Sequence, residues 1–122
     1  MADSSTQILS IVIFLALVSQ GYSQCSLHDL SVEQSQTGAK VHGKTEWSVT
    51  ITNKCPCVQT NVILNCIGFK SAERIDPSLL RVTPKGCLVN DGQSIYSDAI
   101  KFKYSWDNSF PLNPIYSEIA CS

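Results

Sequence analysis

Six cysteines constrain the fold of this chain more than any other feature of its sequence. They are Cys25, Cys55, Cys57, Cys66, Cys87 and Cys121, and all lie beyond the first two dozen residues. An even number of cysteines in a short chain, behind an apolar leader, predicts a framework of about three disulfides formed in an oxidising compartment. Because so small a domain buries little apolar surface, disulfides at about 2–4 kcal/mol each would supply much of its stability.

The amino-terminal segment has the pattern of a secretory signal peptide. Residues 8–18 form a continuous apolar run that matches a signal-peptide core and falls short of the ~20 residues that cross a bilayer. Small residues at Gly21 and Ser23 favour cleavage after Ser23. We therefore predict a signal peptide at 1–23 and a single mature domain at 24–122 that is extracellular and not inserted in a membrane. A membrane anchor or a buried core helix is the alternative.

The sequence favours neither a cofactor nor an active site. Cys55-Pro56-Cys57 is not a Cys-x-x-Cys pair and has no matching second pair, so we expect no metal and no other cofactor. His28 and His42 are the only histidines, and the known nucleophile, zinc-protease and phosphate-binding motifs are missing. We therefore predict no catalytic residues and no enzyme. A net charge of −1 without a basic cluster argues against nucleic acid as a partner.

The mature part has the alternation of apolar and polar residues that is typical of β-strands. It is clearest over 30–35, 47–52 and 100–105, and further strand-like stretches lie at 58–66, 79–82 and 115–121. Several short strands, turn signals between them and no helical period predict a small antiparallel β-sandwich.

The connections carry predictions of their own. Residues 36–44 are predicted as the polar connection of a hairpin, 68–77 as a loop with a short strand at Phe69, and 90–93 as a tight turn. If the first two strands form a hairpin, Cys25 lies opposite Cys55 or Cys57, and we predict that it bonds one of them.

Aromatic side chains are the remaining candidates for a binding site. Trp47, Phe102 and Tyr104 alternate with polar residues, so we expect them in the core. Trp106 and Phe110 flank a polar loop that contains proline, and we predict that they form an exposed contact patch for a partner. The alternative is that both fold back and cap the sandwich.

The string Cys87-Leu88-Val89-Asn90-Asp91-Gly92-Gln93 resembles a hallmark of the tapetum determinant-like family of plant secreted cysteine-rich proteins. The strand from Trp47 to Asn53, the order of the six cysteines and Phe102-Lys103-Tyr104 fit the same family. The family's founder is an extracellular ligand of a leucine-rich-repeat receptor kinase that directs cell fate in the anther. The resemblance implies a secreted signalling protein of the apoplast whose partner is a receptor-kinase ectodomain and whose six cysteines are framework cysteines.

A second resemblance supports a different class of function. The segment from Trp47 to Asn53, followed by Gly92-Gln93-Ser94 and Phe102-Lys103-Tyr104, is similar to the cellulose-binding modules of plant glycoside hydrolases, which are also β-sandwiches. Such a module stacks exposed aromatic rings on sugars. Here Trp106, Phe110 and Tyr116 are the candidates, and the partner implied is a cell-wall polysaccharide.

Overall fold

The structure is a computed structural model that describes residues 25–121, so the predicted signal peptide at 1–23 lies outside the described residues. Within them, strands dominate and the only helices are two short 3₁₀ turns. In chain order the elements are η1 (Leu27–Asp29), β1 (Leu30–Val41), β2 (Lys44–Asn53), β3 (Val58–Leu64), β4 (Leu80–Thr83), β5 (Gly86–Val89), η2 (Asn90–Gly92), β6 (Ile100–Ser105) and β7 (Pro114–Ala120). None of the helices in this part of the chain is long and apolar enough to cross a membrane.

β1 and β2 form the hairpin that the alternation predicts, but the strands are longer than expected. They continue through residues 36–44, where we predicted only a polar connection, and turn at His42 and Gly43. Both turn residues have positive φ, as a tight two-residue hairpin turn requires. The prediction failed there because this stretch is polar and mostly exposed on both faces, with a register shift between Gln36 and Lys40.

β6 pairs with β2 and completes a three-stranded sheet in the order β1-β2-β6. The register places Val49 beside Phe102 and Trp47 beside Tyr104. Val49, Phe102 and Tyr104 are buried, and Trp47 packs against the core from its edge. The expected core role of these aromatic residues is therefore confirmed.

The second sheet has four strands in the order β4-β5-β3-β7. Its core-facing residues are fully buried; they include Val62, Leu64, Cys87 and Val89. The short strand β5 was not predicted, because its four residues lie between two turns and show no alternation. The strand predicted at Phe69 is wrong: this residue lies in the loop between β3 and β4.

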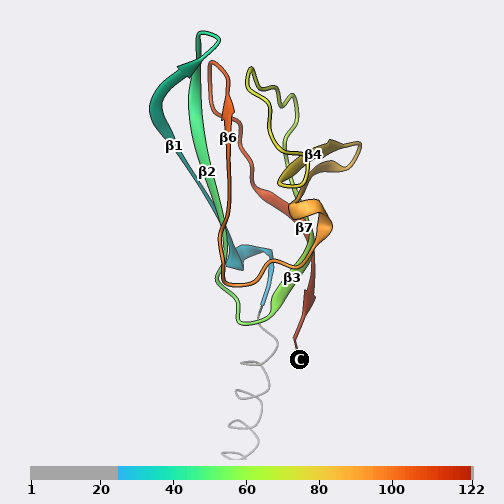
Figure 1. The fold of residues 1–122 in the computed structure, drawn as a ribbon. Coiled ribbons are helices and arrows are strands. Elements are labelled where there is room, and N and C mark those ends of the chain that lie inside the picture. The colour runs from blue at the N-terminus through green and yellow to red at the C-terminus, as the bar shows by residue number, and fades with distance from the viewer. Residues whose placement is uncertain (1–24, 122) are drawn as a thin grey trace, which may run out of the picture.

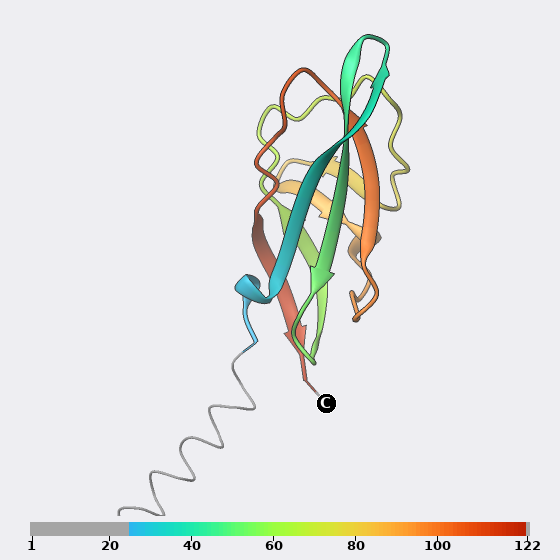
Figure 2. The same ribbon diagram turned by 90° about the vertical axis from the view of Figure 1, so that its left-hand side faces the viewer.

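The two sheets pack as the antiparallel sandwich that the sequence predicts. Figure 1 shows β1, β2 and β6 as one layer and β3, β4 and β7 as the other. In Figure 2 the three-stranded sheet faces the viewer and covers the second sheet. The core between them draws on both layers and on the connections; it includes Ile51, Leu64, Ile95, Tyr104 and Leu112.

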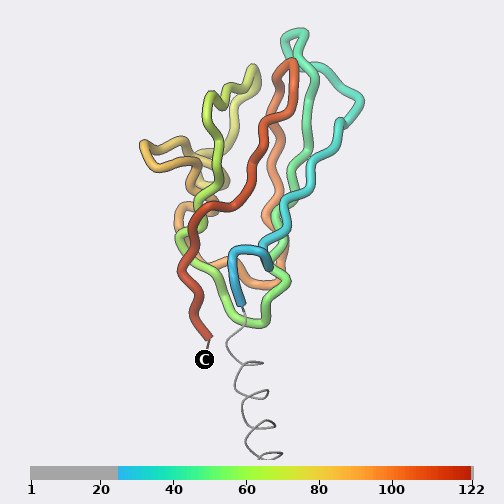
Figure 3. Tube along the Cα trace, turned by 180° about the vertical axis from the view of Figure 1, so that it is seen from behind, coloured from blue at the N-terminus to red at the C-terminus, as the bar shows by residue number. Residues whose placement is uncertain are grey.

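Three disulfides hold the sandwich, and they are Cys25–Cys55, Cys57–Cys121 and Cys66–Cys87. The first confirms that Cys25 bonds one of the two close cysteines. Because Cys25 and Cys121 both attach to the loop between β2 and β3, the two ends of the described chain lie at the same end of the molecule (Figure 3). We call this end, defined by Cys25, Cys55, Cys57 and Cys121, the cysteine pole.

Two buried amides organise the backbone next to the cysteine pole. The Nδ2 of Asn53 donates to the carbonyls of Cys57 and Ile95, at 2.9 Å each. The Oδ1 of Asn53 accepts from the backbone N–H of Cys55 at 3.1 Å and from Nε2 of Gln59 at 3.3 Å. Since an unpaired buried amide costs about 1–3 kcal/mol, these bonds stabilise the observed backbone of the cysteine-bearing loop.

Candidate functional site

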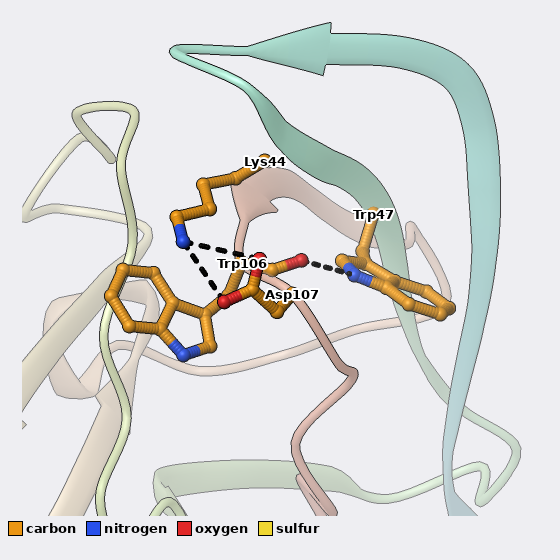
Figure 4. A network of polar contacts seen from close by, with 4 residues as sticks. All are labelled: Lys44, Trp47, Trp106 and Asp107. Atoms are coloured by element: carbon orange, nitrogen blue, oxygen red, sulfur yellow. Dashed lines mark hydrogen bonds and ion pairs between the residues drawn. The ribbon is translucent and has the colours of Figure 1, made fainter.

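Trp106, a predicted partner contact, follows β6 and is held by residues of β2 (Figure 4). The Nζ of Lys44 lies 5.0 Å from the centre of the indole ring and also binds the carboxylate of Asp107 at 2.9 Å. The Nε1 of Trp47 donates to the carbonyl of Trp106 at 3.3 Å. Exposed cation–π and ion-pair contacts contribute about 1 kcal/mol or less each, so they orient the indole more than they stabilise the fold.

Phe110, the other predicted contact, is half-buried in an aromatic cluster. Its ring centre lies 5.2 Å from that of Phe69 and 5.9 Å from that of Tyr104. The backbone N–H of Phe110 donates to the Tyr104 hydroxyl at 3.0 Å, and its carbonyl accepts from Nε2 of Gln34 at 2.7 Å. These contacts give Phe110 a packing role. That Phe110 and Trp106 also touch a partner stays a prediction.

Tyr104 belongs to this aromatic cluster and is fully buried. Burial raises the pKa of its phenol above the ordinary value of 10, and the hydrogen bond from Phe110 opposes part of that shift. The hydroxyl also donates to Oε1 of Gln34. The phenol is therefore neutral at physiological pH and acts as a structural hydrogen-bonding group.

The outer face of the four-stranded sheet carries a row of side chains that crosses all its strands. The register places Arg81 beside Leu88, Leu88 beside Ile63, and Ile63 beside Tyr116. Ile63 and Leu88 point away from the core, because the residues on either side of each along β3 and β5 are more deeply buried. Tyr116 is 47% exposed. From the sequence, Tyr116 was a candidate only for stacking on a sugar, and neither Ile63 nor Leu88 was a candidate contact.

Three members of this row, Ile63, Leu88 and Tyr116, line a groove of about 530 Å³, which we call the outer-face groove. It is lined by Asn61, Ile63, Lys85, Leu88, Ile115, Tyr116 and Glu118. Ile63 lies in the middle strand, with Leu88 and Tyr116 on either side. Lys85 lies in the β4–β5 turn, and the carboxylate of Glu118 binds the amide of Asn61. The groove thus has an apolar centre and one charge of each sign at its margin.

A second hollow of about 450 Å³ adjoins the outer-face groove and shares Lys85 and Ile115 with it. Its lining includes Ile67 and Val82, which are 87% and 62% exposed. Val82 pairs with the core-facing Cys87, and Ile67 lies in the loop after β3, so these two side chains are not part of the outer face of the sheet.

Gly86 allows the β4–β5 hairpin to pack against β3 beside the groove. Its φ of +139° is a conformation that residues with a side chain rarely adopt. A Cβ at this position would lie 2.6 Å from the carbonyl oxygen of Leu64 and 2.7 Å from Cγ2 of Ile63. Only glycine fits this close approach of the turn to β3.

The sequence carries a signal for the outer-face groove in two short apolar runs. An antiparallel strand with one solvated face alternates apolar and polar residues. The runs Val62-Ile63-Leu64 and Cys87-Leu88-Val89 are apolar throughout, which puts apolar side chains on both faces. Two such runs on paired strands indicate a sheet whose outer face is also apolar.

The string from Cys87 to Gln93 forms β5 and the turn that follows it. Asn90 and Asp91 have φ of 55° and 54°, and Gly92 has φ of 77°. Asparagine, aspartate and glycine are the residues that tolerate this left-handed backbone best. The turn conformation thus accounts for the Asn-Asp-Gly part of the string.

The histidines and the clustered cysteines do not form an acid–base or metal centre as the structure stands. His28 lies in η1 and His42 in the β1–β2 turn, at opposite ends of β1, which spans roughly 40 Å at ~3.3 Å per residue. The Sγ atoms of Cys25, Cys55 and Cys57 lie within 4.8 Å of one another. All three are in disulfides, whereas a metal ligand or nucleophile is a thiolate.

The fold and these surfaces define a small, disulfide-stapled β-sandwich domain with an apolar groove on one sheet. A family model described as Tapetum determinant 1, C-terminal, matches residues 26–122. The chain belongs to this family, which confirms the resemblance found in the sequence.

A similar curated protein is the TPD1 protein homolog 1B of Oryza sativa subsp. japonica. It is 35% identical over 100 residues, which cover 80% of this chain and 58% of the relative. The chain thus spans little more than half the length of that relative. No solved structure matches the chain.

Proposed function

We propose that this chain is a secreted plant signalling protein that binds the ectodomain of a leucine-rich-repeat receptor kinase. Its expected role is cell-fate specification, such as anther and tapetum development, without enzymatic activity. The observation that carries the proposal is membership of the tapetum determinant family over residues 26–122. The 35% identity to a rice protein named as a TPD1 homologue supports it.

The disulfides support an extracellular location in the apoplast. Structural disulfides form and persist in oxidising compartments and are rare in the cytosol. All six cysteines of the chain are paired. With the signal peptide predicted at 1–23, this favours a route through the secretory pathway.

We place the receptor contact at the outer-face groove. Hot spots of protein interfaces are apolar or aromatic anchors in well-packed pockets, and Ile63, Leu88 and Tyr116 offer such a pocket. They stand on paired strands, so the surface is held in shape before binding and loses little conformational freedom. Lys85 and Glu118 at the margin favour a receptor surface that offers an acidic and a basic residue around an apolar side chain.

Binding of the oxidised domain to purified receptor-kinase ectodomains tests the proposal. We expect Tyr116→Ala to weaken binding at least about tenfold, the loss expected of an interface anchor. Tyr96→Ala is the matched control, because Tyr96 is 63% exposed and lies outside the groove, and should change affinity less than about threefold.

The possible outcomes test the receptor-ligand function and the location of the contact surface separately. If the wild-type domain binds no ectodomain, the receptor-ligand function is wrong. If it binds and Tyr116→Ala binds equally well, the function stands and the groove is the wrong surface. A loss with Trp106→Ala instead would place the contact at Trp106 and Phe110.

The alternative function is binding of a cell-wall polysaccharide. The three rings that would stack on sugars come from different surroundings: Tyr116 from the outer-face groove, Phe110 from the aromatic cluster and Trp106 from beneath Lys44. Rings in such different surroundings do not favour a flat row that stacks on sugars, and the structure therefore favours a protein contact over a polysaccharide. Retention of the domain on cellulose that Trp106→Ala abolishes would favour the polysaccharide.

A further inference from the structure

The cysteine pole holds two disulfides close together. The Sγ atoms of Cys25, Cys55 and Cys57 all lie within 4.8 Å of one another, although Cys57 is bonded to Cys121. Cys25 is thus near both cysteines of the Cys55-Pro56-Cys57 loop. Cys25 is bonded to Cys55, but the sulfur of Cys57 is also close to it. The spacing of the cysteines in the sequence did not decide between these two partners.

We infer that the cysteine pole is a thiol–disulfide exchange site, in which a Cys57 thiolate displaces Cys55 from Cys25. The co-reactant is an external thiol, such as a dithiol oxidoreductase of the secretory pathway or the apoplast. It enters at Cys121, which is exposed at the end of the domain. This inference is independent of the identity of any receptor.

The exchange proceeds in three balanced steps. In the first, the external thiolate attacks Sγ of Cys121, a mixed disulfide forms, and Cys57 leaves as a thiolate. In the second, Cys57 attacks Sγ of Cys25, the Cys25–Cys57 bond forms, and Cys55 leaves as a thiolate. In the third, Cys55 attacks Sγ of Cys121, the Cys55–Cys121 bond forms, and the external thiolate is released unchanged. No net oxidation or reduction takes place.

The local hydrogen bonding favours attack at Cys25 over attack at Cys55. The backbone N–H of Cys57 points at Sγ of Cys55, with the nitrogen 3.2 Å away. A donor at this position stabilises negative charge on Cys55, and a more stable thiolate leaves faster. Attack at Cys55 itself would close a bridge between residues only two apart, which ordinary disulfide geometry does not accommodate without strain.

The third disulfide supplies an internal contrast. Cys66 follows β3 and Cys57 precedes it, so the seven residues of β3 separate them by roughly 20 Å. Cys87 is also fully buried. Cys66–Cys87 is therefore out of reach of the exchange and stays intact while the cysteine pole rearranges.

The product differs from the starting fold in where the last strand is anchored. Cys121 directly follows β7 and is bonded just before β3, its neighbour in the sheet. After the exchange it is bonded to Cys55, two residues earlier in the chain. The site thus gives one sequence two covalent forms that differ at the end of β7.

The test locates the free thiol in the Cys121→Ser variant, which leaves Cys57 without its partner. The oxidised variant is alkylated with iodoacetamide, and fragmentation of the peptide across Cys55-Pro56-Cys57 places the label. We expect at least roughly a tenth of the label on Cys55. This fraction corresponds to a free-energy difference of no more than about 1.4 kcal/mol between the Cys25–Cys55 and Cys25–Cys57 pairings. A label found only on Cys57 would overturn the inference.

Two further measurements keep the result unambiguous. Cys87→Ser is the matched control, and its label should fall on Cys66 alone, with Cys25–Cys55 retained. If Cys121→Ser does not fold, the wild-type domain is treated briefly with limiting dithiothreitol and alkylated. Peptides that join Cys25 to Cys57 support the exchange, whereas Cys25–Cys55 intact beside alkylated Cys57 and Cys121 refutes it.

Discussion

Replacing Gly86 with alanine tests how closely the β4–β5 hairpin packs against β3. The new Cβ would lie 2.6 Å from the carbonyl oxygen of Leu64 and 2.7 Å from Cγ2 of Ile63, at a φ of +139°. Backbone strain in such a region costs about 1–3 kcal/mol, and overpacking a well-packed site costs another 1–3 kcal/mol or so. We therefore expect Gly86→Ala to lower the free energy of unfolding by about 2–6 kcal/mol, a large share of the ~5–15 kcal/mol typical of a domain.

Gly43→Ala is the matched control for this experiment. Gly43 has a φ of +79°, and nothing lies within 4 Å of the position its Cβ would take. That substitution meets only the left-handed backbone penalty, about 1–2 kcal/mol. Equilibrium urea unfolding with the disulfides intact measures both, and the Gly86 variant should have the lower midpoint, by about 1 M at the usual slopes. Equal losses in the two variants would refute the close approach of Gly86 to β3.

Three other predictions concern the aromatic cluster and the third disulfide. Tyr104→Phe leaves the N–H of Phe110 without its acceptor. It should lower the free energy of unfolding in urea by about 1–3 kcal/mol. An unchanged free energy of unfolding would contradict this hydrogen bond. Because burial raises the pKa of Tyr104, the stability from its neutral phenol is complete below pH 10 and declines as pH rises through the raised value. Ultraviolet titration of phenolate should show a late step that Tyr104→Phe removes, and a titration without it would oppose this assignment. Cys66→Ala with Cys87→Ala opens a bridge of sequence separation 21 and should cost about 3 kcal/mol, whereas a loss below about 1 kcal/mol would mean the bridge adds little.

The strands that could be predicted are those with one face in the core. Val49, Ile51 and Phe102 alternate with polar residues because one side of β2 and β6 meets the second sheet and the other meets water. The distal part of the β1–β2 hairpin has no such asymmetry, so its residues looked like a connection. Strand β5 is too short to show a period at all.

The candidate groove was harder to predict than the fold because its residues come together only through the pairing register of the strands. Ile63, Leu88 and Tyr116 belong to three different strands and become neighbours only when these strands pair. Trp106 and Phe110 are the contacts that the sequence predicts, since aromatic residues beside a proline-containing loop are typical of contact sites. Both are held by long-range hydrogen bonds donated by Trp47 and Gln34, which spacing along the chain does not reveal. The Phe110 N–H also donates to the Tyr104 hydroxyl.

The placement of the first and last cysteines has a mechanical consequence. A pull on the two ends of the domain enters at Cys25, crosses to Cys55, follows the backbone to Cys57 and leaves through Cys121. Since the Cα–Cα spans of these bridges are 5.7 Å and 4.7 Å, the ends cannot separate by more than roughly 18 Å while both bonds hold. Tension therefore bypasses every strand of the sandwich. A domain pulled at both ends would keep its surfaces intact until one of these bridges breaks.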